Sequence, residues 1–130
     1  MAYFSATGTG GGQTNKPVLL WINPNPTSTF KAQTINVDAS NYEYLIFKIC
    51  ADSNATTPYY SYVGIKHDNN KFGIGTNSNA NTSVGNGGYI RNYDTSDNVI
   101  KISTGYTTAG AANTRYAIPL EIYGLKKALL

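Results

Sequence analysis

Residues 42–50 read YEYLIFKIC, and this stretch decides the fold class. In an extended chain Leu45, Phe47 and Ile49 share one face, because successive side chains point to opposite sides. The opposite face is also partly apolar, since Ile46 lies on it. Two apolar faces are typical of a central strand in a packed pair of sheets.

Outward from this stretch, short segments with strand character recur at intervals of about 8 to 12 residues, separated by turn residues. No window of about eleven residues shows helical periodicity. The pattern predicts an all-β fold, a jelly-roll-like β-sandwich of about eight short antiparallel strands. The expected strands are residues 18–22, 30–37, 42–50, 59–67, 72–75, 89–93, 99–104 and 115–123.

Three segments carry more specific expectations. The run VLLWI at residues 18–22 is continuously apolar and is followed by two prolines, which predicts a buried strand with a stiff corner after it. Residues 76–88 are polar and rich in Asn, Ser and Gly, so we expect a surface loop there. Pro119 cannot donate a backbone hydrogen bond, so the last strand should lie at an edge or contain a bulge.

The length of 130 residues suits one domain. Residues 1–17 are small and polar around a run of glycines, and we expect a flexible arm there, followed by the β-sandwich domain at residues 18–130. Within the arm, Tyr3 and Phe4 are candidates for docking against a partner. The alternative is a frayed terminus without a function.

Composition excludes several classes of protein. Only 13% of the residues are charged, and the chain has one Cys and one His. A disulfide framework, a multi-Cys zinc site and a two-His metal site are therefore excluded within the chain. The cations are scattered, so we expect no nucleic-acid partner. The longest apolar run is far shorter than the ~20 residues of a membrane helix, and the start lacks a secretory signal, so we expect no membrane insertion.

Catalytic chemistry has weak support in the sequence. A carboxylate pair or a Cys–His dyad needs side chains that converge on a cleft, whereas the candidates fall in turns or on strand faces. A calcium site in the Asp-Asn-Asn turn lacks the DxDxDG spacing. We therefore expect a protein that is not an enzyme and holds no cofactor and no metal. The candidates set aside are Glu43, Asp94, Asp97, Glu121, Cys50, His67 and residues 68–70.

Tyrosine is the positive signal, because it occurs 11 times and gathers beside an Asn-rich stretch. A tyrosine ring can stack on the apolar face of a sugar while an amide pairs with its hydroxyls. Adaptable protein-binding loops use the same residue types. An equally weighted alternative is that Tyr is a good strand residue with a polar tip. The candidate ligand-binding residues are Tyr60, Tyr62, Asn77, Asn79, Asn81, Asn86, Tyr89 and Tyr93.

Two further stretches carry a resemblance to a known family. They are LLWINPNPTSTFKAQTINVDASNYEYLIFKI, near the start of the domain, and RYAIPLEIYGLK, near its end. They resemble small tail-associated or C-terminal fibre domains of bacteriophages and prophages of Gram-positive gut bacteria. The matching positions are Leu20, Trp21, Asn23, Pro24, Pro26, Ser28, Phe30, Ala32, Gln33, Thr34, Tyr116, Ala117, Ile118, Pro119, Ile122, Tyr123, Gly124 and Lys126.

The resemblance implies a virion location, with assembly in the bacterial cytoplasm, and a β-sandwich displayed on the particle as a trimer. It defines no catalytic residues. The resulting hypothesis is a non-enzymatic bacteriophage virion structural protein, a tail- or fibre-associated domain for receptor binding or adhesion. The alternative is a capsid or tail decoration protein with an assembly role. Expected partners are other virion proteins, further copies of the chain and, for the adhesion hypothesis, a host cell-surface glycan.

Overall fold

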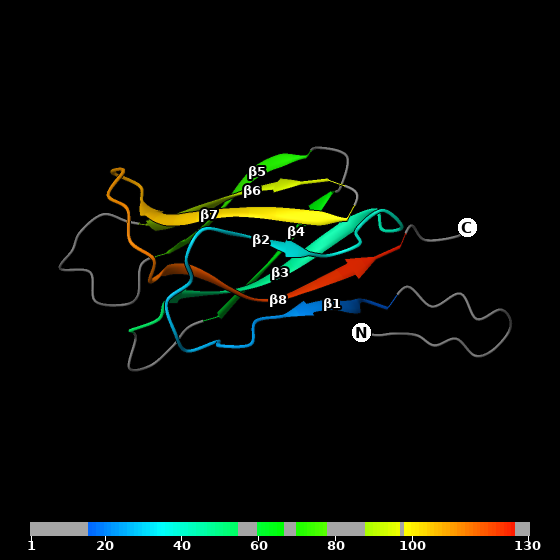
Figure 1. The fold of residues 1–130 in the computed structure, drawn as a ribbon, viewed down its shortest axis with the longest axis horizontal. Helices are drawn as coiled ribbons and strands as arrows, with labels where there is room; N and C mark the ends of the chain where they lie inside the picture. Colours follow the sequence, from blue (N-terminus) through cyan, green and yellow to red (C-terminus); the bar gives the residue numbers. More distant parts are fainter. Residues whose placement is uncertain (1–15, 55–59, 67–69, 78–87, 97, 127–130) are drawn as a thin grey trace, which may run out of the picture.

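A computed structural model describes residues 16–54, 60–66, 70–77, 88–96 and 98–126 (Figure 1). Eight strands form two four-stranded antiparallel sheets that pack face to face, so the predicted all-β sandwich is confirmed. Sheet A has the strand order β1-β8-β3-β4, and sheet B has the order β2-β7-β6-β5. The strands are β1 (Val18–Ile22), β2 (Gln33–Asn36), β3 (Tyr44–Asp52), β4 (Tyr60–Lys66), β5 (Lys71–Asn77), β6 (Gly88–Thr95), β7 (Val99–Thr107) and β8 (Tyr116–Leu125).

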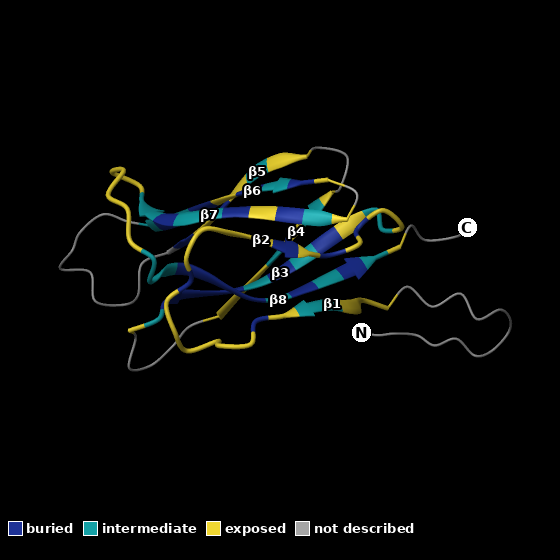
Figure 2. Ribbon diagram, viewed as in Figure 1, coloured by how far each residue is buried: buried dark blue, intermediate teal, exposed yellow. Residues whose placement is uncertain are grey.

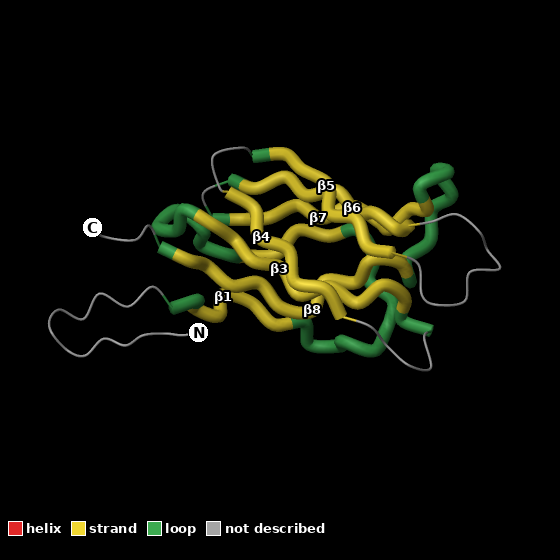
Figure 3. The backbone as a smooth tube through the Cα atoms, turned by 180° about the vertical axis from the view of Figure 1, so that it is seen from behind, coloured by secondary structure: helices red, strands yellow, loops and turns green. Residues whose placement is uncertain are grey.

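The wiring brings the first and last strands of the domain together. β1 pairs with β8 in sheet A, and β2 pairs with β7 in sheet B. The inner strands are joined more locally, because β3 pairs with β4, and β6 pairs with both β5 and β7. Figure 3 shows both layers from behind, with β1, β8, β3 and β4 in one and β7, β6 and β5 in the other, which also contains β2.

β3 is a central strand, as predicted. It lies between β8 and β4, and its Leu45, Phe47 and Ile49 are at most 1% exposed. These side chains face the core between the sheets, and apolar burial of this kind supplies most of the stabilisation of a sandwich. Figure 2 shows the buried residues within the strands, most continuously along β3 and β8, whereas the described loops are largely exposed. The buried apolar partners from the other strands include Ile35, Ile74, Ile100, Ile102 and Ile122.

β1 has the predicted bounds but not the predicted burial. The strand lies at the edge of sheet A, and Val18, Leu19 and Ile22 are 43%, 51% and 57% exposed. Leu19 and Ile22 lie opposite Tyr123 and Glu121, on the side of the sheet that faces away from the core. A continuous apolar run cannot by itself distinguish a buried strand from an apolar edge, so the expectation of a buried strand was wrong.

β8 contains the bulge predicted from Pro119, although the strand is central and not at an edge. The register against β3 shifts so that Lys48 pairs with Glu121 and Ile49 pairs with Pro119, which leaves Leu120 without an opposite residue. Such an extra residue absorbs a position where proline cannot donate. The segment predicted to be a surface loop, residues 76–88, overlaps two strands, because β5 continues to Asn77 and β6 begins at Gly88; residues 78–87 lie outside the described residues.

Asn23 connects the end of β1 to this bulge. Its side chain is 4% exposed, and its Nδ2 donates a hydrogen bond of 2.9 Å to the carbonyl of Pro119. Its backbone N–H donates to the carbonyl of Leu120, and its Oδ1 accepts from the N–H of Asn25. The chain that leaves β1 is therefore attached to β8 by backbone and side chain together.

Arg91 of β6 is a completely buried cation. A guanidinium has five N–H donors in a fixed planar arrangement, and here the three nitrogens bond to five backbone carbonyls. Among the described residues no carboxylate forms an ion pair with it. The carbonyls belong to Ala117 (3.0 Å from Nε), Phe30 and Ser103 (2.9 and 2.8 Å from Nη1), and Thr114 and Tyr116 (3.3 and 2.5 Å from Nη2).

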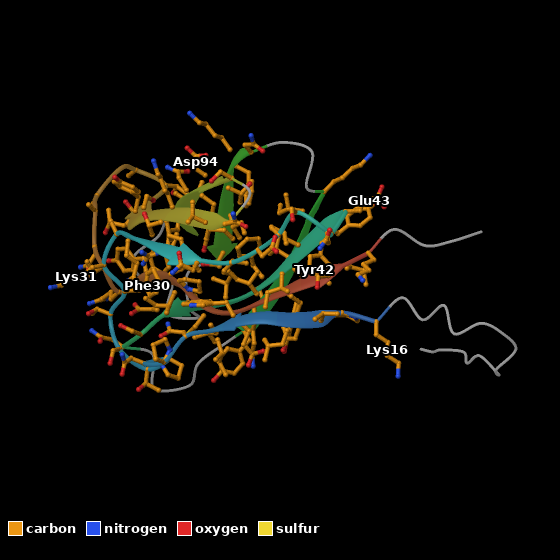
Figure 4. The ribbon with its side chains drawn as sticks, turned by 45° about the vertical axis from the view of Figure 1, so that its right-hand side comes forward. Lys16, Phe30, Lys31, Tyr42, Glu43 and Asp94 are labelled. Carbon is orange, nitrogen blue, oxygen red and sulfur yellow. The ribbon has the colours of Figure 1, made fainter. Side chains whose placement is uncertain are left out.

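These bonds connect both sheets and the loop between β1 and β2. Arg91 and Ser103 belong to sheet B, whereas Ala117 belongs to sheet A. Phe30, in the connecting loop, also places its ring 5.3 Å from the guanidinium carbon. Figure 4 shows Phe30 at the sandwich and the next residue, Lys31, directed away from it. Burial lowers the pKa of Arg91 to about 10, which leaves the side chain charged at neutral pH.

The backbone beside Arg91 is closely packed and locally strained. A Cβ on Gly105 would lie 2.5 Å from the carbonyl oxygen of Tyr116 and 2.8 Å from that of Asn113, so only glycine fits there. Ala117 has a φ of 50°, a left-handed conformation that costs roughly 1–2 kcal/mol for a residue with a Cβ. Its carbonyl is one of the five that Arg91 holds, so the arginine stabilises the strained residue directly.

Aromatic rings also pack in the core, and they include two tyrosines that were expected at a ligand surface. Tyr93 is 2% exposed and stacks on Phe72 at 5.6 Å, with Phe47 at 4.8 Å. Tyr89 is 8% exposed and stacks on Tyr116 at 4.0 Å with an interplanar angle of 3°. Both tyrosines are core residues, because in β6 the face that carries Tyr89, Arg91 and Tyr93 is the inner one.

Removing the Arg91 guanidinium should lower the free energy of unfolding of the domain more than a substitution at the surface does. We expect Arg91→Met to lower the free energy of unfolding by about 3–5 kcal/mol, the usual cost of leaving buried polar partners uncompensated. Arg91→Lys keeps the charge but offers only three donors. We therefore expect it to lower the free energy of unfolding by less than Arg91→Met does. Urea unfolding of each variant measures this free energy.

The matched control is Lys101→Met, which removes an exposed cation from the neighbouring strand β7. It should change the free energy of unfolding by no more than about 0.5 kcal/mol. An Arg91→Met chain with the urea midpoint of the wild type would show that the carbonyl contacts contribute little.

The buried Tyr93 hydroxyl predicts a pH dependence of stability above neutrality. Within the described residues, this hydroxyl has no hydrogen-bond partner. Burial raises the pKa of Tyr93, with Arg91 acting in the opposite direction. An unfolded tyrosine loses its proton near a pKa of about 10, while the folded state keeps it. The contribution to stability is therefore complete below about pH 10 and is lost as the pH rises further.

Tyr93→Phe removes the titrating group and an unpaired hydroxyl. We expect the variant to be as stable as the wild type at pH 7, or more stable by up to about 1 kcal/mol. Above about pH 10 its free energy of unfolding should fall less steeply with pH. Urea unfolding between pH 7 and pH 11 measures both quantities, and identical slopes for the two proteins would refute the assignment. Tyr60→Phe, at an exposed position, is the control for stability at pH 7.

Candidate functional site

Large apolar and aromatic side chains gather on the side of sheet A that faces away from the core. Tyr60 and Tyr62 of β4 are 53% and 62% exposed, and Tyr44 of β3 is 37% exposed. Strand alternation and the pairing registers place the other members on the same side. We name this surface the aromatic face; it consists of Leu19, Ile22, Tyr44, Ile46, Lys48, Tyr60, Tyr62, Glu121, Tyr123 and Leu125.

Lys48 lies beside Tyr60 and Tyr62, the two most exposed tyrosines among the described residues. It pairs directly with Tyr62 across β3 and β4, and its ammonium lies 5.8 Å from the centre of that ring. The same ammonium lies 4.7 Å from the centre of the Tyr60 ring. A cation over an aromatic ring at an exposed site contributes about 0.5–1 kcal/mol. Both rings are thus restrained by one cation before any ligand arrives.

Glu121 and Tyr123 add polar groups to the same face. The hydroxyl of Tyr123 donates a hydrogen bond to the carboxylate of Glu121, two residues earlier on β8. This bond raises the pKa of Tyr123, and the nearby Glu121 charge and Tyr62 contribute in the same direction. Glu121 also lies opposite Lys48 across β8 and β3. The face therefore combines exposed rings with the ammonium of Lys48 and the carboxylate of Glu121, which can bond to hydroxyl groups.

The outer side of sheet B is different in character. A shallow hollow there is lined by Asn92, Lys101 and Ser103 together with apolar parts of neighbouring residues, and no tyrosine as exposed as Tyr60 or Tyr62 lies among the described residues of this sheet. Lys71 and Asp94 approach to 3.9 Å, but their side chains are 80% and 43% exposed, so the pair adds little stability. Figure 4 shows Asp94 at the surface of this sheet. The contrast identifies the aromatic face as the candidate contact surface.

The structure separates the residues that the sequence had grouped into one site. Tyr60 and Tyr62 lie on the aromatic face, whereas Tyr89 and Tyr93 do not, because both are buried in the core. Asn77 ends β5 in the opposite sheet, and only its backbone is described. The remaining candidates, Asn79, Asn81 and Asn86 and the docking residues Tyr3 and Phe4, lie outside the described residues.

Of the aromatic face, the sequence prediction included only Tyr60 and Tyr62, and the members that it missed include Tyr44, Lys48 and Tyr123. Strand alternation in YEYLIFKIC already placed Tyr44 and Lys48 together, opposite Leu45 and Phe47. That signal does not say which residues of distant strands lie beside them. The pairing of β3 with β4 and β8, which periodicity cannot supply, brings the four tyrosines to one surface.

The described residues offer no sign of a metal centre, because no three His, Cys, Asp or Glu side chains come close enough to hold an ion. In the same part of the chain no helix has the length and apolar character needed to cross a membrane. Comparisons with protein-family models, with curated proteins and with solved structures find no match for this chain.

Proposed function

We propose that this chain is a non-enzymatic adhesion domain of a bacteriophage particle, which binds a neutral host cell-surface glycan through the aromatic face. The observation that carries the proposal is the pair Tyr60 and Tyr62. Each is more than half exposed, and both rings are held by Lys48. A monomeric domain normally exposes large side chains singly, so a group of exposed rings on one face favours a binding role.

Sugar recognition uses the chemistry that this face offers. The apolar C–H face of a sugar ring stacks on a tyrosine ring, and the sugar hydroxyls bond to charged or amide groups at the margin. Here the ammonium of Lys48 can donate to hydroxyls and the carboxylate of Glu121 can accept from them. Tyrosine has few rotatable bonds, and restraint by Lys48 lowers the entropy that is lost when a ligand orders the rings.

The location on a phage particle is supported by the sequence resemblance and not by the aromatic face. Several of the matching residues serve the fold, because Asn23 bonds to Pro119 and the carbonyls of Phe30 and Ala117 bond to Arg91. Tyr60 and Tyr62 lie outside the matching stretches. We therefore base the proposed particle location on the resemblance, and the proposed glycan binding on the aromatic face.

A decoration or assembly role is the second candidate, and the exposed apolar residues of β1 favour it. Leu19 and Ile22 are 51% and 57% exposed on the same face as the tyrosines. Aliphatic side chains provide a sugar with apolar contact area but with no aromatic ring to stack on and no hydrogen-bonding group. They are common at contacts between proteins. The two candidates therefore use opposite margins of the aromatic face, β4 for a glycan and β1 for a protein.

Glycan binding is tested by removing the two rings together. We expect Tyr60→Ala/Tyr62→Ala to weaken binding of the fluorescently labelled full chain to a printed panel of neutral bacterial surface oligosaccharides by about tenfold or more, equivalent to about 1.4 kcal/mol. The stacking surface is lost while the core is untouched. Tyr60→Phe/Tyr62→Phe keeps the rings and should retain most of the binding.

The control is Tyr106→Ala, which removes a partly exposed tyrosine from β7 in the other sheet and should leave binding unchanged. If the wild type binds no glycan on the panel, or if the double alanine variant binds as the wild type does, the adhesion proposal fails. Shortening of any bound oligosaccharide during incubation with the purified chain would refute the non-enzymatic assignment.

A further inference from the structure

β1 is an open edge of sheet A. One side of the strand pairs with β8, and among the described residues no strand lies along its other side. The free side presents unpaired backbone N–H and C=O groups, which can accept another strand. Figure 1 shows β1 at the margin of the lower layer, with β8 on its inner side.

The other three edge strands carry features that discourage strand addition. β2 (QTIN) has only four residues, three of them polar. β4 ends in Lys66 and contains Gly64, and β5 begins with Lys71 and contains Gly73 and Gly75. Short length, lysine and glycine are known means of protecting a sheet edge or weakening a strand.

β1 is also short, with five residues, but it lacks lysine and glycine. Its sequence, VLLWI, has no charge and no proline, and it exposes Val18, Leu19 and Ile22. A second protective feature is present, since the register against β8 shifts between Leu19 and Trp21 and leaves Leu20 as a bulge. An apolar edge whose backbone groups are unpaired is a site for pairing with another chain.

We propose that β1 pairs antiparallel with β1 of a second copy of this chain, which joins two A sheets into one continuous eight-stranded sheet. Identical edges meet in this way around a two-fold axis, where each copy offers the same surface. The uncharged strand has no like charges to bring together. Leu19 and Ile22 of both copies would then lie side by side and shield each other from water.

The flanking charge selects the antiparallel arrangement. Lys16 lies just before β1 and points away from the domain (Figure 4). Antiparallel pairing places the two Lys16 side chains at opposite ends of the new ladder, more than ~15 Å apart, which exceeds the screening length of about 8 Å at physiological salt. Parallel pairing would place them side by side. A two-fold dimer also differs from the trimer that the sequence resemblance implies.

The test is sedimentation velocity of the full chain over a range of concentrations. We expect the wild type to shift from one chain to two as the concentration rises. Leu19→Lys/Ile22→Lys places a lysine at two exposed positions of the edge and should raise the dimer dissociation constant at least about tenfold, through charge repulsion and loss of apolar contact. Thr34→Lys/Asn36→Lys adds the same charge to exposed positions of edge strand β2 and should dimerise as the wild type does.

Circular dichroism and thermal unfolding of both variants verify that each is folded at the temperature of the experiment. A wild type that stays monomeric at every concentration, or that forms a trimer, would overturn the proposal. So would an edge variant that dimerises as tightly as the wild type. A chain without residues 1–15 should still dimerise, and loss of the dimer in that chain would assign the contact to the N-terminal segment instead of β1.

Discussion

The carbonyl contacts of Arg91 are the constraint on which the rest of the domain depends. A buried cation without a carboxylate partner is expensive, since its desolvation must be compensated by well-placed dipoles. Here five carbonyls from β7, β8, the segment before β8 and the loop after β1 supply that compensation. The cost is recovered only when all of these segments are in place. Arg91 thereby couples the formation of sheet B to the pairing of the first and last strands, β1 and β8, in sheet A.

Much of the architecture follows from local sequence patterns. The features that were predicted wrongly depend on contacts between residues far apart in the sequence. The alternation of residues 42–50 is enough to predict the central strand, whereas Pro119 predicts either an edge strand or a bulge, and β8 contains the bulge. The burial of VLLWI could not be predicted, because a buried strand and an apolar edge have the same local sequence. Strand alternation along residues 89–93 places Arg91 on one face with Tyr89 and Tyr93, but the carbonyls that make its burial possible come from distant segments of the chain.

The candidate site was predictable in residue type and only partly in position. Exposed tyrosines were expected, and Tyr60 and Tyr62 are exposed, whereas Tyr89 and Tyr93 belong to the core. Propensity treats all four alike, since tyrosine suits either side of a strand. What separates them is the sheet face that each strand turns inward, and that is decided by long-range packing. The same packing leaves sheet A with apolar groups on both sides, and so leaves this domain with a surface suited to contact.

The most direct measurement of the central claim is hydrogen exchange of the Arg91 Nε–H, followed by NMR together with the backbone amides of Asn23 and Phe30. These amides donate to the carbonyls of Leu120 and Thr114 and report on the closing of the loop after β1. If Arg91 holds the loop and both sheets together, its Nε–H and the two amides should exchange only by global unfolding, with the same free energy of opening. An Nε–H that exchanges freely while the core amides remain protected would contradict the account, because the sandwich would then stand without the arginine.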